Sequence, residues 1–335
     1  MKRNAYFDNA KFILIYLVVF GHMLQPFVQD SQSLNTLYTW IYTFHMPVFI
    51  FLAGFFAKGA GSLAYITKLA KKLLVPYIIF QVIYTGYYLA IGKQNWLADS
   101  IFYPHWSLWF LVSLFCWHIL LIFYKKLPPS LSVVIAVQVG LIVGYFGQVG
   151  HTFSLSRTFV FFPFFLLGYW ITVEQVKVLK HVRVKIASLV FMAIMAVGIY
   201  YAPDINSGWL LASKSYGQLG LPEYGGIARF FVYVTSALMG MSILAWIPQR
   251  ELIITSYGSR TLYVYLLHGF FIQFFRQYDL LSVDGIIDLL GIGLLSCLLV
   301  FLLASKPIRI VWQPLIEGRV TILRRLWKQL NPRQT

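Results

Sequence analysis

Long apolar stretches alternate with short polar ones along most of the chain. Many of these stretches run for about 20 residues, the length that an α-helix needs to cross the hydrocarbon core of a bilayer. We count ten and expect each to span the membrane: 11–29, 37–57, 73–91, 107–124, 131–149, 157–173, 184–201, 227–246, 260–276 and 286–304. Runs of this length exclude a β-barrel, so the sequence predicts an all-α integral membrane protein.

Composition supports this interpretation, since 59% of the 335 residues are hydrophobic and 11% are charged, against about 25% charged in soluble proteins. The first apolar segment has no small-residue cleavage site and is expected to be kept as a helix. Cys116 and Cys297 lie in separate apolar segments, a pattern that predicts neither a disulfide nor a metal site. No basic, aromatic-rich soluble domain is visible, so nucleic acid is not an expected partner.

The distribution of Lys and Arg predicts the orientation. With a cytoplasmic N-terminus, five of the 27 Lys and Arg residues fall outside: Lys93, Arg157, Lys214, Arg229 and Arg276. An excess of positive charge inside is the usual topology signal, and it also attracts anionic lipid. Both termini are therefore predicted to be cytoplasmic in a cell-membrane protein. Residues 1–305 are expected to form the polytopic domain, and 306–335 a basic amphipathic cytoplasmic tail that contains "VTILRRLWKQL".

A histidine interrupts the first apolar segment, "KFILIYLVVFGHM". Ionisable residues at membrane depth are costly and are functional candidates by default. His22 follows Lys11 by eleven residues, so both side chains project from one helix face, about 16 Å apart along the axis. Asp8 and Gln25 extend the same polar stripe. Such a stripe predicts a central polar cavity lined by protein rather than by lipid.

Two more histidines are expected near the same depth. His45 lies in the second segment, beside a kink predicted at Pro47, and His268 lies in the ninth. Each has a simpler interpretation, because a buried histidine often only donates to a neighbouring carbonyl group. No Asp or Glu falls at this depth, which argues against a carboxylate proton relay, a metal site with carboxylate-oriented ligands, and a Ser-His-Asp triad. What remains is a histidine that acts as a general base.

Four blocks of the sequence resemble the acyltransferase-3 family of membrane acyltransferases, and most closely its fucose 4-O-acetylase-like branch. The blocks are "YFDNAKFILIYLVVFGH", "YTFHMPVFIFLAGF", "HWSLWFLVSLF" and "YGSRTLYVYLLHGF". They occur in the family's order, and the resemblance extends over nearly the whole chain. The resemblance implies ten or so core helices and a cytoplasmic acyl-CoA as donor. It also implies, as acceptor, a sugar hydroxyl of a cell-surface glycan or its lipid-linked precursor.

The resemblance also implies roles for particular residues. The family's basic pair, usually two arginines, appears here as lysines that would bind CoA phosphates together with Lys11: Lys68, Lys71 and the adjacent Lys72. Lysine is a point charge without the forked geometry of arginine, and these lysines also fit a purely topological role. Trp109 matches a family position, and Arg157 and Arg229 are candidates for holding the acceptor. Trp109 also suits an interfacial aromatic belt.

We therefore expect a membrane O-acyltransferase that transfers acetyl from acetyl-CoA, with His22 as the base, His45 or His268 steadying the oxyanion, and no metal. An acyl-His22 intermediate is an open variant. The alternative function is a glycan or lipid-linked sugar transporter without chemistry, and the least favoured is a structural scaffold. His105 is expected at the outer mouth of the cavity without a chemical role. Three further histidines are expected to be structural or on the surface: His118, His151 and His181. Membrane lipids and further copies of the chain complete the expected partners.

Overall fold

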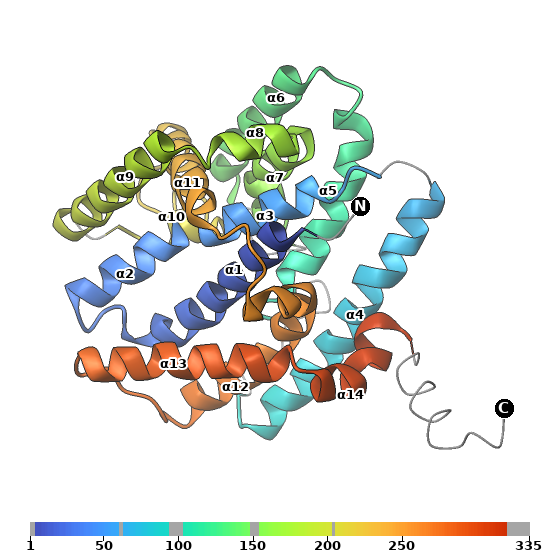
Figure 1. Cartoon of the computed structure of the whole chain (residues 1–335), viewed down its shortest axis with the longest axis vertical. Coiled ribbons are helices and arrows are strands. Elements are labelled where there is room, and N and C mark those ends of the chain that lie inside the picture. The colour runs from blue at the N-terminus through green and yellow to red at the C-terminus, as the bar shows by residue number, and fades with distance from the viewer. Residues whose placement is uncertain (1–3, 60–62, 94–102, 148–153, 203–204, 320–335) are drawn as a thin grey trace.

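The computed structural model describes residues 4–59, 63–93, 103–147, 154–202 and 205–319. Every regular element in this part of the chain is helical (Figure 1). In chain order the elements are α1 (Ala5–Leu24), η1 (Gln25–Phe27), α2 (Gln32–Tyr42), α3 (His45–Phe55), α4 (Leu63–Ala90), α5 (Trp109–Tyr124), α6 (Pro129–Ile142), η3 (Val143–Tyr145), α7 (Leu155–Trp170), α8 (Val173–Val178), α9 (Val182–Tyr201), α10 (Gly208–Leu211), α11 (Gly225–Trp246), η6 (Ile253–Ser256), η7 (Gly258–Arg260), α12 (Thr261–Gln277), α13 (Ile286–Leu303) and α14 (Lys306–Glu317).

Each of the ten predicted segments contains a helix, but not all are long enough to span a bilayer. Within the described residues, six helical stretches have the length and hydropathy for a span: Ala5–Phe27, Gln32–Phe55, Ala64–Ala90, Val182–Tyr201, Gly225–Trp246 and Ile286–Leu303. The helices α5 and α7 have 16 residues each, or about 24 Å, against roughly 30 Å of hydrocarbon. The structure supports a multi-pass membrane protein, while ten spans and cytoplasmic termini stay predictions.

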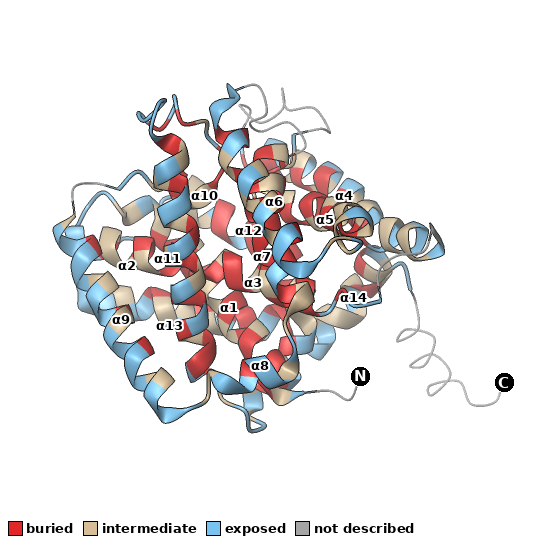
Figure 2. Cartoon of the chain, turned by 90° about the horizontal axis from the view of Figure 1, so that it is seen from above, coloured by how far each residue is buried: buried red, intermediate tan, exposed pale blue. Residues whose placement is uncertain are grey.

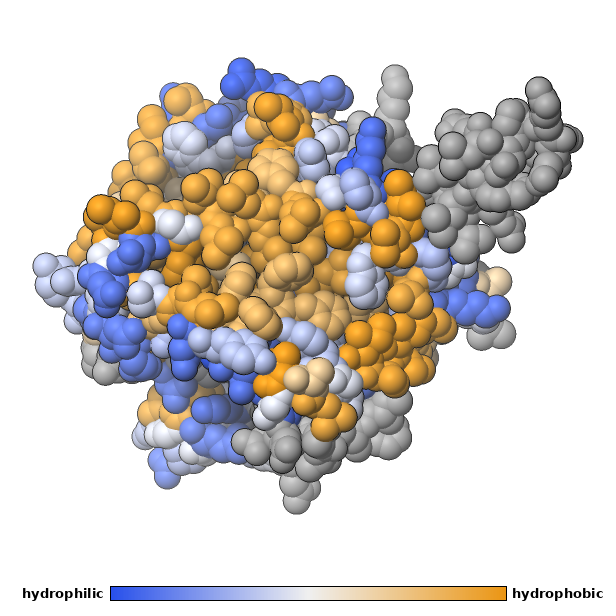
Figure 3. Space-filling model, turned by 90° about the horizontal axis from the view of Figure 1, so that it is seen from below, coloured by the Kyte–Doolittle hydropathy of each residue, from blue (hydrophilic) through white to orange (hydrophobic). Residues whose placement is uncertain are grey.

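The first and third helices lie at the centre of the molecule. Buried residues concentrate on α1, α3 and α12, whereas α9 lies at the periphery and is largely exposed (Figure 2). On α13, exposed apolar residues at every fourth position form one stripe: Ile286, Leu290, Leu294, Leu298 and Leu302. Figure 3 shows a broad apolar area with hydrophilic residues towards its margins. An exposed surface of this kind suits contact with lipid.

A break divides the second predicted segment where Pro47 is expected to kink it. Helix α2 ends at Tyr42 and α3 begins at His45, with Phe44 outside helical geometry between them. The Thr43 hydroxyl donates to the Trp40 carbonyl over 2.7 Å, which satisfies one carbonyl left unpaired at the break. The break turns both Tyr42 and His45 towards the centre, where each is almost fully buried.

Two glycines allow α3 and α7 to pack backbone against backbone. A Cβ atom on Gly54 would collide with the Phe165 carbonyl oxygen, and one on Gly168 would collide with the Phe51 carbonyl oxygen. The two glycines therefore form a reciprocal pair, each lying against the main chain of the other helix. Small residues at such contacts are typical of membrane helices, which associate by close packing rather than by the hydrophobic effect.

The polar residues at the start of α1 bind the segment between α11 and α12. The Asn9 amide donates to the carbonyls of Pro248 and Arg250, each over 3.0 Å, and its oxygen accepts from Thr255 over 2.6 Å. The Tyr6 hydroxyl donates to the Leu244 carbonyl over 3.0 Å. Much of the polar block "YFDNAKF" thus serves the fold, because it pairs main-chain groups at the end of α11.

The residues after the membrane domain begin with a packed helix. In α14, the ring of Trp312 lies 5.8 Å from that of Phe80 on α4, and Ile316 is buried. The first part of the predicted tail is therefore attached to the helical body. The segment "VTILRRLWKQL" lies outside the described residues.

Candidate active site

Helices α1 and α12 bring two of the three candidate histidines together. The His22 and His268 rings are stacked, with centroids 5.7 Å apart. The indole of Trp106 covers both, since its centroid lies 4.4 Å from that of His22 and 5.3 Å from that of His268. These residues come from three distant parts of the chain, so the cluster forms only when the helices pack.

The third histidine joins this cluster through Tyr42. The Tyr42 hydroxyl lies 3.3 Å from His22 Nδ1, and the Tyr42 ring meets that of His45 edge-on at 4.4 Å. His45 is thus separated from His22 by one aromatic side chain. The break between α2 and α3 makes this contact possible, because it places Tyr42 at the end of one helix and His45 at the start of the next.

Main-chain hydrogen bonds fix the tautomers of His45 and His268. Nδ1 of His45 lies 3.0 Å from the Ile41 carbonyl oxygen, and Nδ1 of His268 lies 2.9 Å from that of Val264. A carbonyl only accepts, so Nδ1 is the donor in both rings, and Nε2 of the neutral imidazole is an acceptor. Nε2 of His268 is buried and has no partner in the described part of the chain. A neutral His268 can therefore accept a hydrogen bond but cannot donate one to an oxyanion.

Accessibility separates His22 from the other two histidines. His45 is 2% exposed and His268 is 0% exposed, whereas His22 is partly exposed. A general base must reach the proton that it removes. His22 is thus the most accessible of the three histidines, and the other two lie beside it or one ring away.

An arginine that the sequence analysis did not place in the site lies directly on His22. The Arg276 guanidinium donates through Nη2 to the His22 main-chain carbonyl over 2.5 Å and to Gln25 Oε1 over 2.9 Å. It also lies 5.6 Å from the Trp106 ring centroid, within cation–π range. The signal that could have found it was present, because the predicted topology places Arg276 outside against the charge rule, as it does Arg157 and Arg229.

Trp106 adopts a backbone conformation that tryptophan rarely takes, with φ at 33°. Its flanking residues are anchored on two helices. The His105 main-chain N–H donates to Gln81 Oε1 of α4 over 3.0 Å, and His105 Nε2 lies 2.8 Å from the Thr85 hydroxyl of the same helix. The Ser107 carbonyl accepts from the Tyr265 hydroxyl of α12 over 2.6 Å. Strained residues of this kind persist where the surroundings over-determine them, often at functional sites. The anchors hold the indole over the two histidines.

The candidate donor-binding lysines lie away from the histidines. Lys11 forms an ion pair with Asp8 at 2.7 Å and lies 5.4 Å from the Phe56 ring centroid. Three other lysines are exposed in the first half of α4: Lys68, Lys71 and Lys72. Tyr84, twelve residues beyond Lys72, donates to the Leu266 carbonyl over 2.8 Å. Lys11 therefore lies about 16 Å along α1 from His22, and the three lysines of α4 lie about 18–24 Å along α4 from Tyr84, which contacts α12 two residues before His268.

The two arginines predicted to hold the acceptor contact different parts of the protein. Arg157 donates to the Leu211 carbonyl over 3.2 Å, and its guanidinium lies 5.0 Å from the Trp109 ring centroid. Arg229 is 2% exposed, donates to the Trp209 carbonyl and lies over the Trp209 ring. The structure pairs Arg157 with Trp109, whereas it places Arg229 in a separate aromatic cluster around Trp209.

The remaining histidines fall outside the cluster or flank it. His118 is buried on α5, with Nδ1 3.2 Å from the Tyr65 hydroxyl, and His181 is exposed at the start of α9. His105 is buried beside Trp106, and His151 lies outside the described residues. Over the described residues, no three His, Cys, Asp or Glu side chains are grouped as metal ligands.

Comparison with known proteins identifies the family to which the chain belongs. The sequence model of the acyltransferase-3 family, described as an acyltransferase domain, matches residues 4–305. The nodulation protein NolL of Sinorhizobium fredii is 25% identical over 311 residues, 85% of this chain and 82% of the relative. NolL of Mesorhizobium japonicum is 25% identical over 312 residues, 86% and 80% respectively. No solved structure matches. The chain therefore belongs to the acyltransferase-3 family and is a membrane acyltransferase.

Proposed function

We propose that this enzyme transfers an acetyl group from acetyl-CoA to a hydroxyl of a cell-surface glycan or lipid-linked sugar, with His22 as general base. The observation that carries the proposal is a partly exposed histidine enclosed by two buried histidines, Trp106 and Tyr42. If His22 Nδ1 donates to Tyr42, Nε2 is left to take a proton. Because no carboxylate forms an ion pair with His22 within the described residues, the neutral imidazole is the form that can act as base.

The reaction balances without a metal or a redox group. His22 Nε2 removes the proton of the acceptor hydroxyl while that oxygen attacks the thioester carbonyl, which forms the new C–O bond. The C–S bond then breaks, and the CoA thiolate takes the proton from the imidazolium of His22. The products are an O-acetyl ester and free CoA thiol, and His22 returns to its neutral state.

The arrangement of charges supports entry of the donor from the lysine end. Lys11, Lys68, Lys71 and Lys72 would hold the CoA phosphates, and the thioester would extend along the Lys11 face of α1 towards His22. The roughly 16–24 Å that separates the lysines from the histidine cluster suits a long, thin donor with its phosphates at one end and its thioester at the other. Lysine near a phosphate acts as a point charge.

Acceptor-dependent chemistry tests the proposed function. Purified protein in lipid nanodiscs is given radiolabelled acetyl-CoA and a glycolipid extract that mild alkali has freed of existing esters. We expect alkali-labile label in the glycolipid and release of an equal amount of CoA thiol. Transport of a lipid-linked sugar across a liposome membrane without either product would instead support the transporter alternative.

Loss of the exposed lysines should weaken donor binding selectively. In a Lys68→Gln, Lys71→Gln double variant, we expect the KM for acetyl-CoA to rise roughly tenfold with little change in kcat, because exposed charge pairs contribute about 0.5–1 kcal/mol each. Steady-state kinetics at low ionic strength measures the effect, and added salt should reduce the difference. Lys126→Gln, at an exposed lysine in the turn after α5, is the matched control. An equal rise in KM for the control would show that Lys68 and Lys71 have no specific role in donor binding and act only as topology signals.

A further inference from the structure

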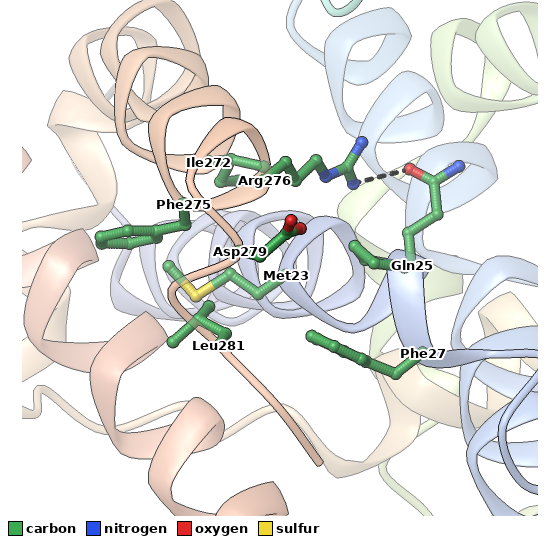
Figure 4. Close-up of a pocket in the computed structure, with 9 residues that line it drawn as sticks. Met23, Gln25, Phe27, Ile272, Phe275, Arg276, Asp279 and Leu281 are labelled. Carbon is green, nitrogen blue, oxygen red and sulfur yellow. Dashed lines mark hydrogen bonds between the residues drawn. The ribbon is translucent and has the colours of Figure 1, made fainter.

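A pocket of about 290 Å³ opens where α1 and α12 end, and it is lined by Arg276, which contacts the His22 main-chain carbonyl. Six residues define it for the present purpose, and we call it the α1–α12 pocket: Met23, Gln25, Phe27, Phe275, Arg276 and Asp279. Figure 4 shows their side chains gathered around it, with the Gln25 amide facing the Arg276 guanidinium. The volume is near the lower end for small-molecule sites, which run from roughly 300 to 1,000 Å³, so it suits one small ring.

Opposite charges face this pocket without neutralising each other. Arg276 uses Nη2 for the His22 carbonyl and Gln25, while its Nε is buried and has no partner in the described part of the chain. Asp279 is exposed and forms no ion pair with Arg276 in the described residues. A buried donor without a partner and a nearby carboxylate are groups that a ligand could satisfy.

This set of groups selects among ligand classes. An anion would meet the Asp279 carboxylate, a cation would meet Arg276, and a purely apolar ligand would leave both charges without partners. A hydroxyl group both donates and accepts, so a ring that carries several hydroxyls can bind Asp279, Arg276 and Gln25 together. Phe27 and Phe275 supply apolar wall for the C–H face of such a ring. These features are those of a site for a neutral sugar.

We propose that the α1–α12 pocket is the acceptor subsite and that it binds one uncharged sugar ring. The proposal rests on the proposed function, since it names the acceptor class for the same reaction. Arg276 is a positioning residue in this scheme, because one guanidinium nitrogen contacts both a pocket residue and the main chain of His22. Binding in the pocket and placement of the base are thereby joined through a single side chain.

Protection of an introduced thiol tests the pocket without requiring turnover. Leu281 lines the pocket, so Leu281→Cys is made in the full chain with Cys116→Ser and Cys297→Ser, and its labelling by a maleimide is timed. The probes are a methyl hexopyranoside and the matching methyl hexopyranosiduronate, which differ by one carboxylate. We expect the neutral glycoside to slow labelling at least about fivefold and the uronate to have little effect. Glu251→Cys, exposed in a distant loop, should label equally fast with either probe.

A second variant tests the charge argument directly. Asp279→Asn removes the repulsion, so the uronate should then slow the labelling of Leu281→Cys nearly as much as the neutral glycoside does. Equal protection by both probes before this change would overturn the assignment of a neutral ligand, and protection by neither would overturn the subsite. Because labelling is measured without acetyl-CoA, the pocket can be disproved while acyl transfer persists, and acyl transfer can be disproved while the pocket still binds.

Discussion

Replacement of His22 by alanine or glutamine is expected to lower kcat at least about 10²-fold, while the protein remains folded. Glutamine can still hydrogen-bond but cannot accept a proton at neutral pH. A loss in both variants therefore points to proton transfer rather than to packing. Acetyl-CoA turnover by the purified variants in detergent measures the effect, and their elution on size-exclusion chromatography reports folding. His181→Ala, an exposed histidine at the start of α9, should keep wild-type turnover.

Near-normal turnover by either His22 variant would show that His22 is not the general base. In that event His268 would be the next candidate, because its buried Nε2 is an acceptor without a partner in the described residues. Exchange of label between acetyl-CoA and free CoA in the absence of acceptor separates direct transfer from an acyl-His22 intermediate. Exchange is expected only if the acetyl group rests on the enzyme.

Replacement of Gly168 by alanine should destabilise the enzyme by about 3 kcal/mol, the upper end of the usual cost of overpacking. The added methyl group would meet the Phe51 carbonyl oxygen, which is rigid main chain rather than the end of a flexible side chain. Gly54→Ala should behave alike against Phe165, and the double variant should fail to accumulate as a folded protein. Thermal unfolding followed by loss of monodisperse protein measures these differences.

The control for this experiment is another helical glycine with open space around it. Nothing lies within 4 Å of a Cβ atom placed on Gly198 of α9, so Gly198→Ala should be neutral or stabilising by up to about 1 kcal/mol through helix propensity. The three variants make the same chemical change in a helix and differ only in their surroundings. If Gly168→Ala unfolds at the same temperature as Gly198→Ala, α3 and α7 do not pack as closely as described.

The helical fold could be predicted because the bilayer leaves the backbone few choices. Apolar runs near 20 residues must form helices in lipid, and every predicted segment contains one. Helix ends were less predictable, since 37–57 reads as one continuous apolar segment and only Pro47 marks the break between α2 and α3. The packed helix α14 was not expected either. Its charged residues give it the composition of a surface tail, although Trp312 and Ile316 contact the helical body.

Only those features of the site that lie within a single helix could be predicted from the sequence. Helical periodicity places Lys11 and His22 on one face, because both lie on the same helix. The contact between Arg276 and His22 joins residues 254 positions apart, and no spacing within a single sequence encodes which helices are neighbours. The same limit applies to Trp106, whose role depends on anchors to α4 and α12. The arginines chosen for the acceptor were therefore Arg157 and Arg229, while the arginine that contacts His22 was passed over.

The backbone strain at Trp106 lowers the stability of the fold but places the indole ring over the histidines. A tryptophan in the left-handed region costs roughly 1–2 kcal/mol, a cost that glycine would largely avoid. Selection for heat resistance alone would thus favour glycine at this position, and the resulting enzyme would gain robustness as it lost the ring over its histidines. Position 106 is accordingly a poor target for thermostabilising design, since the strain there holds the indole 4.4 Å from the His22 ring.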